Sequence, residues 1–503
     1  MTQLFILVSA AMVAALIAAV VLVGASHLTL RRGHGYMHWI FYLMILLVAL
    51  PVLLSARDMT TTAESVMFLA DPVRHPVMDV LQPLMTLMIL AVTGERIFSH
   101  LMWPQKGARV PGILIAALII FWAGTVAAPA IFGAFPTLSH NYFYALIIGI
   151  AVLLASGVER DLAFRAARNA LLIFMAAGVL LIPIAPRLVL DMGYSQGLIP
   201  GLPRLGGLAS HPVSLGVLAQ LGLLCLLACP YQKRWLNRMA WATGLFVLLM
   251  AQSKTSWISF TLCSFCVLMV RQGPVFVRRA SDPVRTDMGI TAICGFMVMV
   301  LAAILIGMFG DIGSRVEAFF NSAEGAQLAS LTGRDHIWAI AYDEWLRNPV
   351  FGYGPTIWNE DFRTLIGMPN ATHAHNQFMD TLARSGTVGA VALTLYGIVL
   401  MFFAIRYTRV SGGLTLALFL ALALRSISEV PLLMFGYGPE LITHILLLMT
   451  LAAAASARSA PKPSAAMPAR PIHVQTRAPL GQGAMVPLGH AAKLPLGQKR
   501  ISI

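Results

Sequence analysis

The stretch "HAHNQFMDTLARSGTVGAVALTLYGIVLMFFAIR", residues 373–406, changes character half-way along. Its first part carries histidines, amides and charged residues, whereas residues 387–405 carry no charge at all. A helix needs about 20 apolar residues to cross the roughly 30 Å of hydrocarbon in a bilayer. The second part therefore predicts a membrane-spanning helix, and the first part a polar cluster at its start.

The apolar pattern recurs along the chain. Of its 503 residues 58% are hydrophobic and only 11% charged, and the mean hydropathy is +0.78, whereas about a quarter of the residues of soluble domains are charged. This composition predicts an all-α polytopic membrane protein, a bundle of about 12 to 13 transmembrane helices. The expected spans are residues 4–25, 38–55, 77–94, 111–131, 141–157, 169–186, 212–230, 239–251, 257–271, 289–309, 387–405, 413–430 and 440–456.

The spans divide the chain into four regions. Residues 1–309 hold ten spans, 310–386 form one large polar loop with short helices, 387–456 hold three more spans, and 457–503 form a tail. The first span lacks the basic start and the small-residue cleavage site of a signal peptide, so we expect a retained helix. The tail repeats "PLGQ" and "PLGH" and has few large apolar residues, which predicts disorder.

The net charge of +14 reflects topology and does not indicate a nucleic-acid partner. Alternate loops together with the tail hold 24 of the 35 Lys and Arg residues and five of the 21 acidic residues. Cytoplasmic loops of membrane proteins are rich in Lys and Arg. We therefore expect the N-terminus and the large loop outside, and the tail in the cytoplasm. The loops at 187–211, 252–256 and 425–440 then share the outer side with the large loop.

Two outer loops carry isolated basic residues in front of apolar spans. In "GLPRLGGLASHPVSLG", residues 201–216, Arg204 and His211 flank glycines, which fits a tight re-entrant turn whose backbone amides face an anion. In "AQSKTSW", residues 251–257, Lys254 is surrounded by hydroxyl residues. The alternatives are a solvated arginine in an ordinary loop and a lysine that reaches the membrane surface.

The large loop contains a predicted helix in "LTGRDHIWAIAYDEWLRNPVFGYGPTIW", residues 331–358. Its apolar residues follow the 3.6-residue period, Thr332 is a plausible N-cap, and the helix ends near Asn348. Arg334 then lies in the first turn, where the helix dipole disfavours a cation. Sequences break such local rules mainly at functional sites, so Arg334 is a candidate site residue.

Aromatic residues follow this helix. Gly352 and Gly354 flank Tyr353 in what we expect to be a rigid turn, and Trp358 lies a few residues further on. Both aromatic side chains are candidates to line the substrate by stacking on sugars. Packing within the loop is the alternative.

The polar cluster predicts a short amphipathic helix over residues 376–385, closed by Gly386 as its C-cap. Asp380 and Arg384 form an i,i+4 pair on its polar face. His375 precedes the helix, where the dipole favours neutral imidazole over imidazolium. A neutral imidazole is a competent general base near neutral pH.

Two other chemistries fit the cluster less well. His373 and His375 are two residues apart, a poor spacing for ligands on a helix, and only Glu360 and Asp361 supply carboxylates nearby, so we expect no metal. The C-x-x-C pair within an apolar span also lacks partner ligands. A Ser-His-Asp hydrolase is not indicated, because no G-x-S-x-G motif accompanies the loop serines.

These motifs together resemble the O-antigen ligase and Wzy-type polysaccharide polymerase superfamily of bacterial inner membranes. The resemblance covers about residues 200–400 and rests on four stretches in this order: "RLGGLASHP" (204–212), "QSKTSW" (252–257), "TGRDHIW" with "NPVFGYG" (332–338 and 348–354), and "HAHNQFMDTLARSG" (373–386). It implies a GT-C-like fold in the inner membrane with the active site on the periplasmic face.

The activity that the resemblance implies is a metal-independent, inverting transfer of glycan. The donor would be an undecaprenyl-diphosphate-linked oligosaccharide and the acceptor a sugar hydroxyl, with no cofactor. Arg204 and Arg334 match arginines thought to hold the diphosphate, and His375 matches the candidate base. The position of Lys254 is often arginine in the family, and lysine lacks the bidentate fork of arginine. His211, His373, Asn376 and Arg384 complete the expected substrate lining.

Several functions remain open within this framework. The sequence of residues 332–358 resembles that of exopolysaccharide polymerases more than that of dedicated ligases. We therefore favour polymerisation of exopolysaccharide or O-antigen repeat units over ligation to lipid A core. For a polymerase we expect partners in polysaccharide export or chain-length control. A polysaccharide or lipid transporter is a rival, but transporters place charges near the bilayer midplane, whereas Asp79, Arg425 and Glu429 lie near predicted span ends. A non-catalytic scaffold is a further rival.

Overall fold

The computed structural model describes residues 2–55, 57–59, 75–103, 110–193, 202–280, 334–369 and 371–459, with single residues between 294 and 301. Several predictions concern other parts of the chain. The span 289–309, the first part of the large loop with Thr332, and the tail from residue 460 lie almost entirely outside the described residues.

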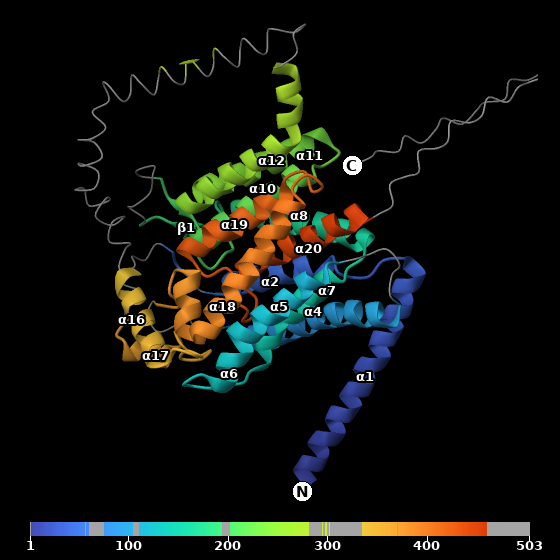
Figure 1. Cartoon of the computed structure of the whole chain (residues 1–503), viewed down its shortest axis with the longest axis vertical. Coiled ribbons are helices and arrows are strands. Elements are labelled where there is room, and N and C mark those ends of the chain that lie inside the picture. Colours follow the sequence, from blue (N-terminus) through green and yellow to red (C-terminus); the bar gives the residue numbers. More distant parts are fainter. Residues whose placement is uncertain are drawn as a thin grey trace, which may run out of the picture. The chain divides into compact units, whose positions relative to one another are not determined.

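Helices make up nearly all the regular structure of the described part (Figure 1). The helices are α1 (Thr2–Arg32), α2 (Trp39–Leu54), α4 (Val77–Met102), α5 (Gly112–Trp122), the π-helix η1 (Ala123–Ala127), α6 (Ala128–Phe132), the 3₁₀-helix η2 (His140–Phe143), α7 (Tyr144–Leu153), α8 (Gly157–Leu180), α9 (Pro186–Val189), α10 (Pro212–Ala228), α11 (Arg234–Met250), α12 (Lys254–Ala280), α16 (Arg334–Arg347), α17 (Glu360–Leu365), α18 (Gln377–Arg406), α19 (Leu414–Ser428) and α20 (Pro439–Ser459). Strands β1 (Leu190–Asp191) and β2 (Arg204–Leu205) pair antiparallel, with Leu190 opposite Leu205.

Six helical segments of the described part are long and apolar enough to cross a membrane. They are Val77–Met102, Gly112–Phe132, Gly157–Leu180, Lys254–Arg279, Gln377–Arg406 and Pro439–Arg458. Four shorter apolar helices accompany them. The predicted all-α polytopic membrane fold is confirmed, and the number of 12 to 13 spans stays a prediction.

The predicted start of the span 169–186 is wrong, because α8 begins twelve residues earlier. Ser156 and Glu159 form a capping box: the Ser156 hydroxyl accepts from the Glu159 amide at 3.2 Å, and Glu159 Oε2 accepts from the Ser156 amide at 2.8 Å. Arg160, expected in a loop, is buried in α8 and donates to the carbonyl oxygen of Ala452 at 3.0 Å. Charged residues can occupy a buried helix when hydrogen bonds and ion pairs satisfy them.

Helix α10 lies at the centre of the core. It packs against α8, α11, α12 and α20, and most of its side chains are buried. An apolar helix covered on all sides explains why its hydrophobic residues show no single apolar face. Its first turn starts at His211, so the core fixes the position of one candidate site residue.

Helix α18 joins the predicted short helix and the predicted span across a kink. Gly386 has φ +61°, so the predicted left-handed closure at this glycine is confirmed. The break frees backbone groups that would otherwise bond within the helix, and the chain at residues 349–354 pairs with them. Tyr353 N donates to Ala383 O at 2.9 Å and Thr387 N donates to Pro349 O at 2.8 Å.

The predicted helix in the large loop is also confirmed. Helix α16 spans Arg334–Arg347 and packs against α18, and Figure 1 shows it beside α17. A small core lies between these elements, formed by Ile337, Ala341, Ile357, Trp358, Phe362, Ala371, Ala374 and Ala383. This core holds the polar cluster against the transmembrane helices.

Candidate active site

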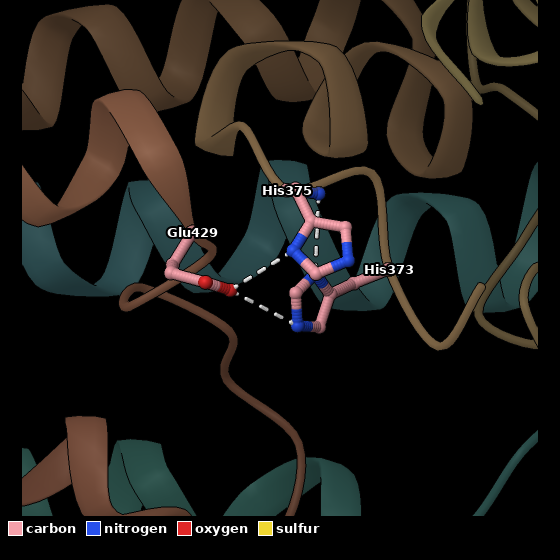
Figure 2. A group of neighbouring side chains, drawn as sticks. All are labelled: His373, His375 and Glu429. Atoms are coloured by element: carbon pink, nitrogen blue, oxygen red, sulfur yellow. Dashed lines mark hydrogen bonds and ion pairs between the residues drawn. The ribbon is translucent and has the colours of Figure 1, made fainter. Parts of the chain in front are cut away.

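His373 and His375 direct their rings at one carboxylate oxygen of Glu429 (Figure 2). His373 Nε2 and His375 Nδ1 each lie 3.3 Å from Glu429 Oε2, and the two ring centroids are 4.2 Å apart. Glu429 is the residue that ends α19, so a carboxylate 54 positions along the chain completes the cluster. All three side chains are partly exposed and so accessible to a ligand.

The turn that carries the histidines is held from two sides. Trp338 of α16 donates its indole N–H to Ala374 O at 2.8 Å, and Asp380 Oδ1 accepts from Ala374 N at 3.2 Å. His375 has φ +49°, a left-handed conformation that is uncommon for a residue with a side chain. Such backbone strain persists only where the surroundings enforce it, and it is concentrated at functional sites.

The hydrogen bonds assign the tautomers of both rings. His373 Nδ1 accepts from the His375 backbone N–H at 3.1 Å, so a neutral His373 carries its proton on Nε2, which lies 3.3 Å from Glu429 Oε2. A carboxylate only accepts, so His375 Nδ1 donates to the Glu429 carboxylate. The other ring nitrogen of His375, Nε2, is then left with a lone pair, as a general base requires.

Glu429 is a charged acceptor in this arrangement. Burial acts to raise the pKa of this carboxyl, but the hydrogen bond from His375 and the positive charge of Arg425 outweigh it and lower the pKa to about 2. Arg425 Nη2 lies 4.0 Å from Glu429 Oε1 and 3.6 Å from Glu440 Oε1. Burial and the neighbouring His375 lower the pKa of His373, against the opposing effect of Glu429.

His373, His375 and Glu429 are also a group that could hold a metal ion, because their ligand atoms lie within 4.8 Å of one another. Two histidines and a carboxylate are a common zinc ligand set. Coordination through His373 Nε2 would, however, move the ring proton to Nδ1. That nitrogen already faces the backbone N–H of His375, so two donors would oppose each other. The hydrogen bonding therefore fits a proton-holding cluster better than a metal centre.

Arg204 is fixed by the strand pair and by its own side chain. It lies in β2 opposite Asp191, is 6% exposed, and donates from Nε to Ala251 O at 2.9 Å. The predicted role of the loop's backbone amides is wrong for the two glycines. The amides of Gly206 and Gly207 both donate to Val189 O, next to the strand pair. These two N–H groups are therefore taken and do not face an anion.

His211 is the N-cap of α10, and its Nδ1 accepts from Val213 N at 3.1 Å. Burial and the positive charge of Arg204 lower the pKa of His211 to about 4, while Glu429 acts to raise it. Charges from residues 204–211 and from the end of α19 thus act on one ring. The candidate base and the basic loop therefore lie within electrostatic range of each other.

Lys254 is the first residue of α12 and is exposed. The turn before it contacts the basic loop, since Gln252 donates to Leu202 O at 2.9 Å. The two residues after it, Thr255 and Ser256, line a small cavity of about 20 Å³ that Arg425 also lines. The start of α12 thus lies beside the charged network that reaches Glu429.

Arg334 is the first residue of α16 and is partly exposed. It stands one helical turn before Trp338, whose indole binds the backbone between the two histidines. Its predicted N-cap, Thr332, lies outside the described residues.

Residues 239–394 match the family model for O-antigen ligase. The resemblance to the O-antigen ligase and Wzy-type polymerase superfamily is confirmed. No curated protein matches the chain. The O-antigen ligase match includes Lys254, Arg334 and His375, whereas Arg204 and Glu429 lie outside the matched residues.

Four predicted substrate-lining residues of this O-antigen ligase-like site make contacts within the protein. Arg384 is buried, pairs with Asp380 at 3.1 Å and donates to Pro355 O at 2.7 Å, so the predicted i,i+4 pair is confirmed, and its substrate contact stays a prediction. The pair is buried because the loop core covers the first turns of α18. Asn376 is the N-cap, with Oδ1 accepting from Phe378 N at 3.0 Å.

Both aromatic candidates pack against neighbouring aromatic rings. Trp358 is 4% exposed, in edge contact with Phe362, and the Tyr353 ring lies 4.4 Å from that of Phe135. The structure shows packing for both rings, which was the alternative, and sugar stacking stays a prediction. These aromatic residues fill the small core because the short loop helices have no other apolar cover.

Glu429 is the main site residue that sequence reasoning missed. The sequence signal was an acidic residue near the end of the predicted span 413–430, on the side of the membrane predicted for the large loop. Nothing in its sequence context pairs it with the histidines, since the contact depends on how α19 packs against α18.

Proposed function

We propose that this protein transfers glycan from an undecaprenyl-diphosphate-linked oligosaccharide to an acceptor hydroxyl on the periplasmic face of a bacterial inner membrane. The family match supports glycan transfer of the ligase or polymerase type in general. The observation that carries the proposal is the orientation of His375, whose Nδ1 is bound by Glu429 and whose Nε2 is left as a base.

The reaction is a single displacement with inversion. His375 Nε2 takes the proton of the acceptor hydroxyl while that oxygen forms a bond to the anomeric carbon of the donor sugar. The bond from that carbon to the phosphate oxygen breaks, and the undecaprenyl diphosphate leaves with the electron pair. The resulting imidazolium is stabilised by Glu429, as in other histidine–carboxylate pairs.

The leaving diphosphate needs positive charge as its own charge grows. Arg204, Lys254 and Arg334 are the cations proposed to supply it. Arg204 and Lys254 are linked through the 251–256 turn, and Arg334 lies on the helix that holds the histidine turn. Cations in these places support a reaction that needs no metal.

We favour polymerisation of repeat units, because the sequence of residues 332–358 resembles exopolysaccharide polymerases. Ligation to lipid A core is the second candidate. The second candidate is favoured by the family match, whose description is O-antigen ligase. Both activities use the same donor, base and cations, and they differ in the acceptor alone.

The deciding experiment supplies a purified preparation in nanodiscs with the undecaprenyl-diphosphate repeat unit, alone or with lipid A core, and resolves the products by gel and mass spectrometry. Chain growth from the repeat unit alone supports polymerase, and modified lipid A core supports ligase. A wild type that acts on neither acceptor would contradict the proposed function.

Single-residue variants test the role proposed for each residue. Replacing His375 by Ala should reduce the rate roughly 100- to 10,000-fold, the usual contribution of a general base. His336 on α16 is exposed and outside the cluster, so His336→Ala is the matched control. Ala replacements of Arg204, Lys254 and Arg334 should raise the KM of the donor and lower the rate. Activity should survive EDTA treatment; loss on chelation, restored by Zn²⁺, would replace the base mechanism by a metal one.

In cells that lack the gene, the same variants should follow the same order in complementation. Loss of exopolysaccharide with intact lipopolysaccharide supports the polymerase, and the converse supports the ligase.

A further inference from the structure

Arg57 is surrounded by backbone carbonyl groups of two separate segments. Its Nε and Nη2 donate to Leu188 O at 3.2 and 2.7 Å, and Nη2 also donates to Gly207 O at 2.9 Å. Its Nη1 donates to Ala209 O at 2.7 Å and to Ser210 O at 3.1 Å. One side chain just after α2 thus ties the chain before β1 to the chain after β2.

These contacts use the whole hydrogen-bonding capacity of the side chain. A guanidinium has five N–H donors in a fixed plane, and five hydrogen bonds are made here. Burial lowers the pKa of Arg57, in keeping with a charge enclosed by protein. With its donors taken, Arg57 is not available to bind a phosphate group itself.

We infer that Arg57 is a positioning residue, which fixes residues 204–211 so that Arg204 and His211 meet the donor diphosphate in one orientation. The inference rests on the proposed function. Three of the four carbonyl groups that Arg57 binds belong to Gly207, Ala209 and Ser210, which lie between the two site residues.

The apolar residues of this loop are held by the main hydrophobic core, which includes Leu205, Leu208 and Ala209, whereas Arg57 holds its backbone carbonyl groups. The strand pair is two residues long, and beyond it the glycine amides bond to Val189 O. Met59 adds one contact: its N–H donates to Arg187 O at 2.8 Å, and a Cβ atom at Gly206 would meet its side chain at 2.7 Å. Residues 57–59 therefore act as a clamp across both sides of the loop.

Lysine cannot reproduce the arrangement. Its ammonium group has three donors around a point charge, whereas the carbonyl groups here lie around a planar fork. The histidine–glutamate cluster, by contrast, is carried by α18 and α19 and makes none of these bonds. Loosening the loop should therefore weaken donor binding and leave the chemical step intact.

The test compares Arg57→Gln and Arg57→Lys with wild type in the purified transfer assay. We expect the KM of the donor to rise roughly tenfold in Arg57→Gln, because a set of charge-assisted hydrogen bonds is lost. The rise should be smaller in Arg57→Lys. The kcat at saturating donor and its pH profile should match those of wild type. A general loss of folded protein would instead lower the kcat. Arg187→Gln removes the same charge from an exposed side chain of the same region and is the control.

Gly207→Ala perturbs the same loop without touching Arg57. Gly207 has φ +53°, and an added Cβ would meet the Leu215 side chain at 3.2 Å, so the same rise in KM with unchanged kcat is expected. It replaces Arg57→Gln as the test if that variant fails to fold.

Two results would overturn the inference: Arg57 variants with the KM of wild type, or a fall in kcat with an altered pH profile at unchanged KM. If the wild type is active and the Arg57 variants are unaffected, only the proposed role of Arg57 is contradicted. An inert wild type contradicts the proposed function instead.

Discussion

At the scale of single residues, Glu429 decides what His375 can do. A neutral imidazole has one donor and one acceptor nitrogen, and its partner selects which is which. A carboxylate on Nδ1 leaves Nε2 as the acceptor, whereas a carboxamide could accept or donate there and would allow both tautomers. The same oxygen lies 3.3 Å from His373 Nε2, so one carboxylate contacts both rings.

Glu429→Gln should therefore lower kcat roughly 10- to 100-fold, as loss of a partner that orients a functional histidine does. Because the pKa of Glu429 is about 2, its carboxylate is charged throughout pH 5–8, and the fall should be similar across that range. Initial rates at saturating donor measure it. Glu360→Gln, at an exposed position of the large loop, is the control, and equal rates for both variants would contradict the role of Glu429.

At the scale of elements, the kink in α18 joins the large loop to the transmembrane bundle. Gly352 and Gly386 face each other across this junction: a Cβ at Gly352 would lie 2.6 Å from the backbone nitrogen of Gly386. The close approach lets backbone groups on both sides of the break find partners, which buried N–H and C=O groups require. The two glycines are therefore needed for geometry that no larger residue allows.

Gly386→Ala should destabilise the protein by about 3 kcal/mol or more, since the new Cβ would run into the backbone of Val350 in a left-handed conformation. Gly397→Ala on the same helix has nothing within 4 Å and should be neutral or stabilising by roughly 0.5–1 kcal/mol. Thermal unfolding in detergent measures both. Equal midpoints for the two variants would show that the kink is dispensable.

The N-cap of α10 makes stability depend on pH. The pKa of His211 is about 4 in the folded protein against an ordinary 6.5, so between these values the unfolded chain binds more protons. Stability is therefore full above about pH 6.5 and falls as the pH drops toward 4. His211→Asn keeps a capping acceptor and does not titrate, so its unfolding midpoint should fall less over this interval. Parallel slopes for the two proteins would refute this assignment.

At the scale of the whole molecule, the site is assembled from segments far apart in the chain. The histidine turn, the end of α19, the start of α12 and residues 204–211 act on one another through ion pairs, hydrogen bonds and electrostatic range. The proposed donor and acceptors are lipids that present their sugars to water, so they would meet at a membrane surface, where polar loops lie over an apolar bundle. The predicted topology sends all of these loops to the outer side.

Labelling of single cysteines in intact cells tests that topology. In a cysteine-free background, Asp361→Cys in the large loop should react with a membrane-impermeant maleimide, and Lys233→Cys should react only after the membrane is opened. Both positions are exposed in the structure, so a difference in labelling reports on which side of the membrane each residue lies. The reverse pattern would invert the topology and place the site in the cytoplasm.

The sequence by itself determined the membrane fold, most helix positions and the break at Gly386. These follow from local rules: apolar length, helical period, and residue types that suit a cap or a positive φ. It also predicted the resemblance to the O-antigen ligase and Wzy-type superfamily, through motifs that stay in order along the chain.

Only the tertiary structure decided which side chains meet. It placed Glu429 against both histidines, buried Trp358 and Arg384, extended α8 over its arginines and enclosed Arg57 in carbonyl groups. The reason is that burial and charge pairing depend on how separate helices pack, and residues 54 or 150 positions apart leave no joint pattern in the local sequence.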